Sequence, residues 1–197
     1  MNTTIIPIIL AAGRGSRFGR ENKLLYNLYG KPMIQHSLEI FLELFEKVVI
    51  VLGNDKETMI NFLNSFNKNK INYISNNNWE EGGMSSSVKI GIKYVDENFL
   101  SLGVLIHPGD IPLITKDDIE SILNTIKKSN YKKVVIPQYR SKNGHPLFIP
   151  KNLFSEIYKI NESSEGLKGF LKGNSTNIFF ANCGKGILKD IDSKVNV

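Results

Sequence analysis

The sequence from residue 5 to residue 19 reads IIPIILAAGRGSRFG and joins a short apolar run to a glycine-rich turn. The run from Ile5 to Leu10 is mostly β-branched, which is typical of a strand that is covered on both faces of a sheet. The small residues Ala11, Ala12 and Gly13 end this run. We therefore expect a central strand whose carboxyl end opens directly into a loop.

Apolar runs and helical patterns alternate along the rest of the chain. Pro32 stands at the first position of one predicted helix, and Thr115 with Asp118 resembles a capping box at the start of another. Strands are predicted over residues 48–52, 71–74, 102–107, 133–137 and 178–181, and helices over 31–46, 55–66, 85–95, 115–129, 153–160 and 165–171.

This alternation predicts an α/β fold class: a doubly wound, mostly parallel sheet with helices on both faces. The reason is that parallel neighbours need crossovers of about a dozen residues. After Tyr139 the alternation breaks, and a small β-hairpin through Gly144 to Phe148, followed by helical stretches, is expected in the C-terminal third. Ligands of such sheets bind beyond the carboxyl ends of the strands. We therefore expect the functional residues in the loops that follow the strands.

The composition is that of a globular protein, because 41% of the 197 residues are apolar and 22% are charged. A chain of this length is expected to form one domain, residues 1–197. Cys183 is the single cysteine, which excludes an intramolecular disulfide and multi-cysteine metal motifs and fits a reducing, cytoplasmic compartment. The apolar run at residues 5–10 lacks a basic stretch before it and is far shorter than a membrane span of about 18 residues. We expect a soluble protein with no membrane partner.

The charge balance favours an anionic ligand. Lys and Arg number 25 against 19 Asp and Glu, which gives a formal net charge of +6. These charges do not form the blocks of like sign that bind nucleic acid. We therefore expect a nucleotide, and no nucleic acid, as the anionic partner.

The glycine-rich turn at residues 13–19 is a candidate phosphate-binding loop. Small residues let backbone N–H groups approach phosphate oxygens, and Arg17 with Lys23 adds positive charge. The alternative is a turn that merely joins two elements. The dinucleotide-binding pattern G-x-G-x-x-G does not fit because Phe18 stands at its third glycine, and a Walker A loop does not fit because Arg20 replaces its lysine.

The segment from Leu10 to Lys23 closely resembles the L-A-x-G-x-G-x-R-[MF]-G-x(2,3)-K signature of nucleotidyltransferases with the GT-A-like fold. Three further segments match in order: Gly-Met-Ser-Ser-Ser-Val at 83–88, His-Pro-Gly-Asp-Ile-Pro-Leu at 107–113 and Gly-His-Pro at 144–146. Gly-Met-Ser-Ser-Ser and Gly-His-Pro are the more discriminating pair. They resemble the molybdenum cofactor cytidylyltransferase family, which is related to the molybdopterin guanylyltransferases. The resemblance covers roughly residues 5–192.

The resemblance implies a Mg²⁺ site at Asp110. A carboxylate that follows a strand can face the cleft, and Mg²⁺ favours such hard oxygen ligands together with substrate phosphates. The plain alternative is a turn aspartate before Pro112. The second metal-side group of the family lies in a D-I-D-T-P-E-D-like segment, of which residues 190–193 match only the start. Asp190 is favoured over Asp192 as that group, and a solvated tail is the alternative.

The resemblance also implies which residues contact nucleotide and acceptor. The nucleotide-binding set is Leu10, Ala11, Ala12, Gly13, Gly15, Arg17, Lys23, Ser87 and Asp110. Ser87 is placed against a pyrimidine edge, although helix capping alone would use one of the three serines. His145 is assigned to the acceptor side, with an ordinary hairpin residue as the alternative. Trp79 and Met84 line a base or pterin pocket or pack in the core, and Cys183 is expected to be a small buried or half-buried residue rather than a nucleophile.

The activity implied by the resemblance is transfer of CMP from CTP to the phosphate of molybdopterin or molybdenum cofactor, with release of pyrophosphate. Its product would supply a molybdenum hydroxylase apo-enzyme. The implied catalytic residues are Arg17, Lys23 and Asp110, and both cations are expected to be exposed in the empty cleft. Two alternatives stay open: the same fold acting on a sugar 1-phosphate or an alcohol phosphate, and a non-catalytic carrier of the finished cofactor. The three aligned charged residues favour catalysis.

Overall fold

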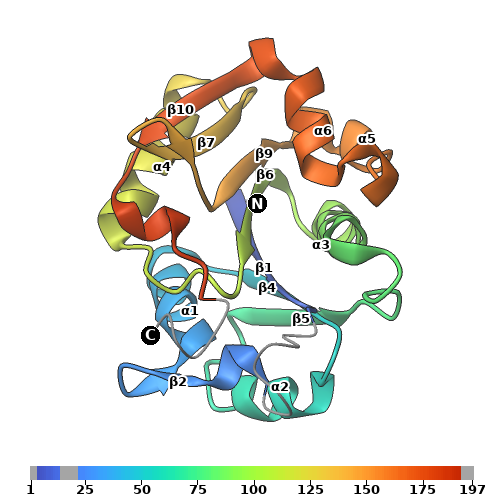
Figure 1. Cartoon of the computed structure of the whole chain (residues 1–197), viewed down its shortest axis with the longest axis vertical. Helices are drawn as coiled ribbons and strands as arrows, with labels where there is room; N and C mark the ends of the chain where they lie inside the picture. The colour runs from blue at the N-terminus through green and yellow to red at the C-terminus, as the bar shows by residue number, and fades with distance from the viewer. Residues whose placement is uncertain (1–3, 14–21, 192–197) are drawn as a thin grey trace.

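An eight-stranded sheet runs through the computed structural model, which describes residues 4–13 and 22–191 (Figure 1). The strands are β1 (Thr4–Ala11), β4 (Val48–Leu52), β5 (Ile71–Ser75), β6 (Ser101–Pro108), β7 (Val134–Tyr139), β8 (Lys142–Asn143), β9 (Leu147–Pro150) and β10 (Ile178–Asn182). Their order is β10-β7-β9-β6-β1-β4-β5, with β8 paired to β7. Only the pairings of β8 and β9 are antiparallel among these strands. The predicted α/β fold with a mostly parallel sheet is confirmed.

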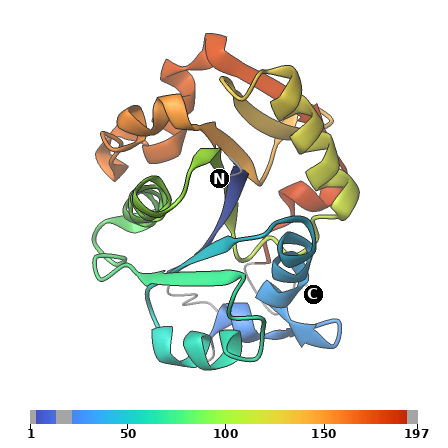
Figure 2. The ribbon, with the colours of Figure 1, turned by 180° about the vertical axis from the view of Figure 1, so that it is seen from behind.

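Helices cover both faces of this sheet. They are α1 (Met33–Leu44), α2 (Lys56–Leu63), α3 (Gly83–Asn98), α4 (Lys116–Lys128), α5 (Phe154–Ile157) and α6 (Gly166–Gly173). Figure 1 shows α1 and α4 on one side of the sheet and α3, α5 and α6 on the other, and Figure 2 shows the same arrangement from behind. Among the described helices, none combines the length and the apolar character needed to cross a membrane.

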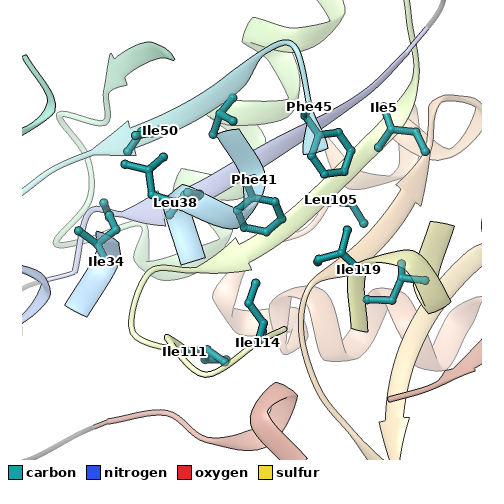
Figure 3. Close-up of a cluster of buried hydrophobic side chains, with 14 of the residues drawn as sticks. Ile5, Ile34, Leu38, Phe41, Phe45, Ile50, Leu105, Ile111, Ile114 and Ile119 are labelled. Atoms are coloured by element: carbon teal, nitrogen blue, oxygen red, sulfur yellow. The ribbon is translucent and has the colours of Figure 1, made fainter. Parts of the chain in front are cut away.

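The two faces of the sheet carry two separate cores. Ile5 and Ile9 of β1 pack with α1 and α4, whereas Ile6 and Ile8 pack with α3 and α5. Figure 3 shows the first of these cores, in which Phe41 of α1 lies among side chains from the sheet and from α4. Because successive residues of a strand point to opposite faces, a strand covered on both faces must be apolar throughout. This is the physical origin of the continuous apolar run at the start of the sequence.

Helix α3 lies unusually close to the sheet. A side-chain Cβ at Gly91 would stand 2.8 Å from the Ile8 side chain, so only glycine permits this separation. The capping box of α4 is also present, with Thr115 and Asp118 bonded reciprocally as predicted. The first contact holds the middle of α3 against the sheet, and the capping box fixes the start of α4.

The hairpin of the C-terminal third differs from the prediction. The antiparallel hairpin joins β7 to β8, and its turn consists of Arg140 and Ser141, which both have positive φ. A two-residue turn with positive φ at both positions matches the twist of the flanking strands. Such turns are usually marked in a sequence by Asn-Gly, which is absent here. The segment from Gly144 to Pro146 instead connects β8 to β9 and runs beside residue 187.

The helix boundaries differ from the prediction by up to three residues, as α1 and α2 illustrate. Helix α1 begins at Met33, because Pro32 is extended and pairs with Asn27 in a small two-stranded sheet of β2 (Asn27–Leu28) and β3 (Lys31–Pro32). Helix α2 ends at Leu63, and Phe66 follows it in a turn. Neither difference moves a residue of the candidate site.

Candidate active site

The carboxyl ends of β1, β4 and β6 lie side by side at one edge of the sheet. β1 pairs with β6 on one side and with β4 on the other, so the chain reverses its direction across the sheet at β1. Open α/β sheets bind ligands at such a reversal. The N–H of Gly109 donates to the carbonyl of Leu10 (3.0 Å), and that of Asn54 donates to the carbonyl of Ala12 (3.3 Å). The start of the glycine-rich loop is thereby tied to both neighbouring turns.

Lys23 and Asp110 form an ion pair at this edge. Lys23 Nζ lies 2.8 Å from Asp110 Oδ2, and the two side chains are 10% and 30% exposed. The short helix η2 (Lys23–Leu25) holds the lysine there, capped by Asn22, whose side chain accepts the N–H of Leu24. The expectation that Lys23 is exposed in the empty cleft is therefore wrong, because a largely buried ammonium group needs a charged partner.

The remaining residues of the predicted nucleotide loop divide into two groups. Ala11 and Ala12 are buried, Leu10 is half-buried, and Gly13 is exposed at the point where the loop leaves the sheet. Gly15 and Arg17 lie outside the described residues. The described part of the loop therefore presents its backbone next to the Lys23–Asp110 pair.

Lys23→Ala is expected to raise the KM for the nucleotide about tenfold, which corresponds to about 1.4 kcal/mol of lost binding. It should also lower the free energy of unfolding by about 1 kcal/mol, as expected for an ion pair of this exposure. The control is Lys31→Ala, which breaks the more exposed Lys31–Glu39 pair away from the cleft. Steady-state kinetics and thermal unfolding measure both effects, and an unchanged KM would contradict a nucleotide-binding role.

The C-terminal segment brings Asp190 to Asp110. The N–H of Ile191 donates to the carbonyl of Asp110 (3.0 Å), and the Ile191 side chain is buried against Leu28 and Met33. Asp190 itself is exposed. The carboxylates of Asp110 and Asp190 both act electrostatically on one histidine. Asp192 lies outside the described residues.

That histidine is His145, and it lies next to His107. The Nε2–H of His107 donates to the carbonyl of Ile111 (3.0 Å), which braces the turn that carries Asp110. Burial lowers the pKa of His107 to about 3, and burial also lowers the pKa of His145 against the opposing influence of the two carboxylates. Both rings are therefore neutral at pH 7. The Nδ1 atom of each is buried without a hydrogen-bond partner among the described residues.

Ser87 is held by a residue that the sequence analysis did not single out. The Nδ2 atom of Asn76, at the end of β5, donates to Ser87 Oγ (3.0 Å) and to Ser86 Oγ (2.7 Å). The Oδ1 atom of Asn76 accepts the N–H of Asn78 (3.0 Å), and this contact fixes which way the amide points. Ser87 therefore accepts a hydrogen bond from Asn76, and its own hydroxyl can donate to another acceptor. The only signal in the sequence was the position of Asn76 directly after a strand.

A pocket of about 380 Å³ opens beside Asn76 at the same edge of the sheet. Its volume falls within the range of small-molecule sites. Trp79 is one of its walls, so the predicted role of this residue in lining a pocket is supported, whereas Met84 is 52% exposed and lines a different pocket near α6. The lining residues are Gly53, Asn54, Asp55, Lys56, Glu57, Asn76, Asn77 and Trp79.

The donor set fits a Mg²⁺ ion that arrives with its substrate. Asp110 and Asp190 offer two hard carboxylates, and the described chain contains no cluster of three or more His, Cys, Asp or Glu residues suited to a metal. Mg²⁺ is commonly held by one or two carboxylates together with substrate phosphates and water. Two carboxylates of this kind could hold a divalent metal ion together with a substrate.

Cys183 is expected to react slowly with alkylating reagents. Burial, aided by the charge of Asp118, raises the pKa of its thiol to about 11. At pH 8 the thiolate fraction should be about a hundredfold below that of a free cysteine, because only the thiolate is nucleophilic. Iodoacetamide labelling followed by mass spectrometry measures the rate, with glutathione as the reference thiol. A rate equal to that of glutathione would contradict a thiol pKa raised by burial. The labelling rate of Cys183 should keep rising as the pH approaches 11.

Comparison with known proteins shows what this architecture resembles. The family model described as the MobA-like NTP transferase domain matches residues 7–178. A 2-C-methyl-D-erythritol 4-phosphate cytidylyltransferase from Alkaliphilus oremlandii is 33% identical over 66% of this chain and 55% of its own length. A protein of Thermococcus sibiricus named "Probable molybdenum cofactor guanylyltransferase" is 32% identical over 72% of this chain and 64% of its own length. The chain thus spans about half to two thirds of these relatives.

Solved structures agree on the fold. The Rv0371c protein of Mycobacterium tuberculosis superposes with a TM-score of 0.82 at 16% identity, covering 100% of this chain and 96% of its own. A structure of the same protein in complex with manganese has a TM-score of 0.72. The sheet order, the glycine-rich loop after β1 and the match over residues 7–178 lead to one conclusion: this chain belongs to the family of MobA-like NTP transferase domains.

Proposed function

We propose that this protein transfers a nucleoside monophosphate from an NTP to the phosphate of an acceptor and releases pyrophosphate. The observation that carries the proposal is the Lys23–Asp110 ion pair at the reversal point of the sheet, with Asp190 beside it. A cation and two carboxylates at this position are what a triphosphate and its metal ion require. The family of the chain supports the same reaction class.

The reaction needs positioning and charge neutralisation from the protein rather than a general base. An oxygen of the acceptor phosphate, already ionised at pH 7, attacks the α-phosphorus in line, and the bond to the pyrophosphate oxygen breaks. Lys23 and Arg17 bind the triphosphate, and the backbone from Leu10 to Gly15 approaches its oxygens. Mg²⁺, when bound by Asp110 and Asp190, supplies charge neutralisation at the transferring phosphoryl group.

The hydrogen-bond polarity of Ser87 supports CTP as the nucleotide. Because Asn76 donates to Ser87, the serine hydroxyl is oriented to donate to a ligand. Cytosine presents two acceptors, O2 and N3, on its pairing edge, whereas guanine presents mainly N–H donors there. A donor at this place therefore favours cytosine, which offers two acceptors, over guanine, which offers only O6. The pocket beside Asn76 and Trp79 is the space we assign to this end of the nucleotide.

Molybdopterin or molybdenum cofactor is the acceptor that we propose, with His145 on its side of the site. The neutral ring of His145 lies in the segment that connects β8 to β9, where the charges of Asp110 and Asp190 act on it. The Thermococcus relative supports this acceptor by its name. The product would then be taken up by a molybdenum hydroxylase apo-enzyme. The name of the Alkaliphilus relative supports the second candidate, an alcohol phosphate as acceptor.

The test is a panel of four NTPs against three acceptors, with Mg²⁺ and pyrophosphate release as the readout. The acceptors are molybdenum cofactor, 2-C-methyl-D-erythritol 4-phosphate and a sugar 1-phosphate. We expect release with CTP and molybdenum cofactor. Release with only another acceptor would keep the reaction class and change the substrate, and binding of cofactor without release from any NTP would identify a carrier.

A further inference from the structure

The first turn of α3 is anchored to a segment from the C-terminal third of the chain. The carboxylate of Glu162, in the short helix η4 (Glu162–Ser164), accepts the backbone N–H of Ser85 at 2.8 Å and also the Ser85 hydroxyl. These two bonds lower the pKa of Glu162, so the carboxylate is charged at neutral pH. One turn further along α3, Lys89 Nζ donates to the carbonyl of Ile160 (3.0 Å). Residues 160–162 thus follow one face of this helix.

The packing at this contact leaves room for glycine alone. A Cβ at Gly83 would lie 2.8 Å from the Glu162 carboxylate, and one at Gly166 would lie 2.6 Å from Ser85 Oγ. Both glycines have a φ of +54, a backbone conformation that other residues rarely adopt. Two glycines with positive φ, from distant parts of the sequence, therefore permit one carboxylate to reach one helix start. A helix capped by a neighbouring residue of its own segment would not require glycine at these two positions.

The contact between Glu162 and Ser85 lies on the opposite side of α3 from Ser87. Ser85 and Lys89 are four residues apart and share a face, whereas Ser87 is two residues from Ser85 and points about 200° away around the helix. On that side Asn76 holds Ser87 and Ser86. The first turn of α3 is therefore held from the back by Glu162 and from the front by Asn76. Any rotation of the turn would move Ser87 relative to the pocket beside Asn76.

We propose that Glu162 is a positioning residue that sets the orientation of Ser87 and thereby the discrimination between nucleotide bases. This inference rests on the proposed nucleotidyl transfer. Glu162 is exposed apart from its contact with Ser85, so its removal leaves no cavity in the core. It acts through the helix start and does not itself touch the substrate.

The experiment compares Glu162→Ala and Glu162→Gln with Glu165→Gln. Glu165 and Glu162 line the same pocket near α6, but the carboxylate of Glu165 pairs with Lys172. Glu165 is therefore a matched control. Four quantities are measured: kcat for each NTP, KM for each NTP, the binding of non-hydrolysable NTP analogues, and amide hydrogen exchange at residues 85–87. For Glu162→Ala we expect the KM for the preferred NTP to rise about tenfold and its kcat to change far less, well below the hundredfold that a 1 Å misplacement of reacting groups can cost. Base discrimination should fall, and exchange at residues 85–87 should become faster.

Glu162→Gln should lie between wild type and Glu162→Ala, because its amide oxygen still accepts the N–H of Ser85. Unchanged base discrimination in Glu162→Ala, with faster exchange, would show a helix cap without a role in specificity and would overturn the proposal. An equal effect of Glu165→Gln would overturn it as well. A wild-type protein that neither binds nor uses any NTP refutes the proposed function instead, and the proposal on base discrimination falls with it.

Discussion

Asp110→Asn is expected to lower kcat/KM for pyrophosphate release at least ~100-fold, as the loss of a preorganised charge contact at a reacting centre commonly does. The substitution keeps the shape of the side chain and removes the charge that faces Lys23 at 2.8 Å. The Asp110 side chain is 30% exposed, so the folded state should survive. Kinetics across a Mg²⁺ titration measure the effect, because a ligand for the ion should shift the Mg²⁺ requirement as well as the rate.

The matched control for this substitution is Asp117→Asn in the first turn of α4. Asp117 is exposed and close in sequence, and we place it outside the site. Asp190→Asn should show a smaller loss than Asp110→Asn with the same shift in Mg²⁺ requirement, because Asp190 is more exposed. Near-normal turnover of Asp110→Asn in excess Mg²⁺ would mean that Asp110 is only a turn residue, and the mechanism would then be wrong.

The second large effect is the preference between bases, where CTP should exceed GTP by a factor of roughly 10⁴ in kcat/KM. A site whose buried polar groups are left unpaired by the wrong ligand discriminates on this scale, whereas size alone discriminates far less. Ser87 is 4% exposed and is held by Asn76, so it cannot turn away from a mismatched base without breaking that contact. Competition kinetics with CTP and GTP measure the ratio directly.

Ser87→Ala should lower the CTP-to-GTP ratio of kcat/KM by a larger factor than it lowers kcat/KM for CTP itself. Ser86→Ala is the matched control, because Ser86 shares the contact with Asn76 but donates its own proton to the carbonyl of Gly83. Its ratio should fall less than that of Ser87→Ala, because Ser86 helps to hold the turn but its hydroxyl hydrogen is already bonded to Gly83. Equal use of CTP and GTP by the unmodified protein would remove the cytidylyl assignment and leave nucleotidyl transfer standing.

The strand and helix pattern was readable because the central strands of this sheet are covered on both faces. Burial on both faces forces continuous apolar runs such as residues 48–52, and these runs stand out against polar loops. The hairpin was misplaced because Arg140 and Ser141 adopt positive φ without the glycine or asparagine that normally signals it. Pro32 was misplaced because its partner Asn27 is outside any periodic pattern.

For the candidate site, the sequence by itself determined the residue types and their order at the strand ends. The carboxyl ends of parallel strands meet at one edge of the sheet, however the helices pack on it. The resemblance to nucleotidyltransferases made Lys23, Asp110, Asp190 and Ser87 the candidate site residues. Only the tertiary structure decided that Lys23 is buried against Asp110, because two residues 87 positions apart leave no local pattern. The same holds for Asn76 behind Ser87 and for Glu162 behind Ser85, since contacts between distant segments depend on how helices pack on the sheet and not on the spacing of residues along the chain.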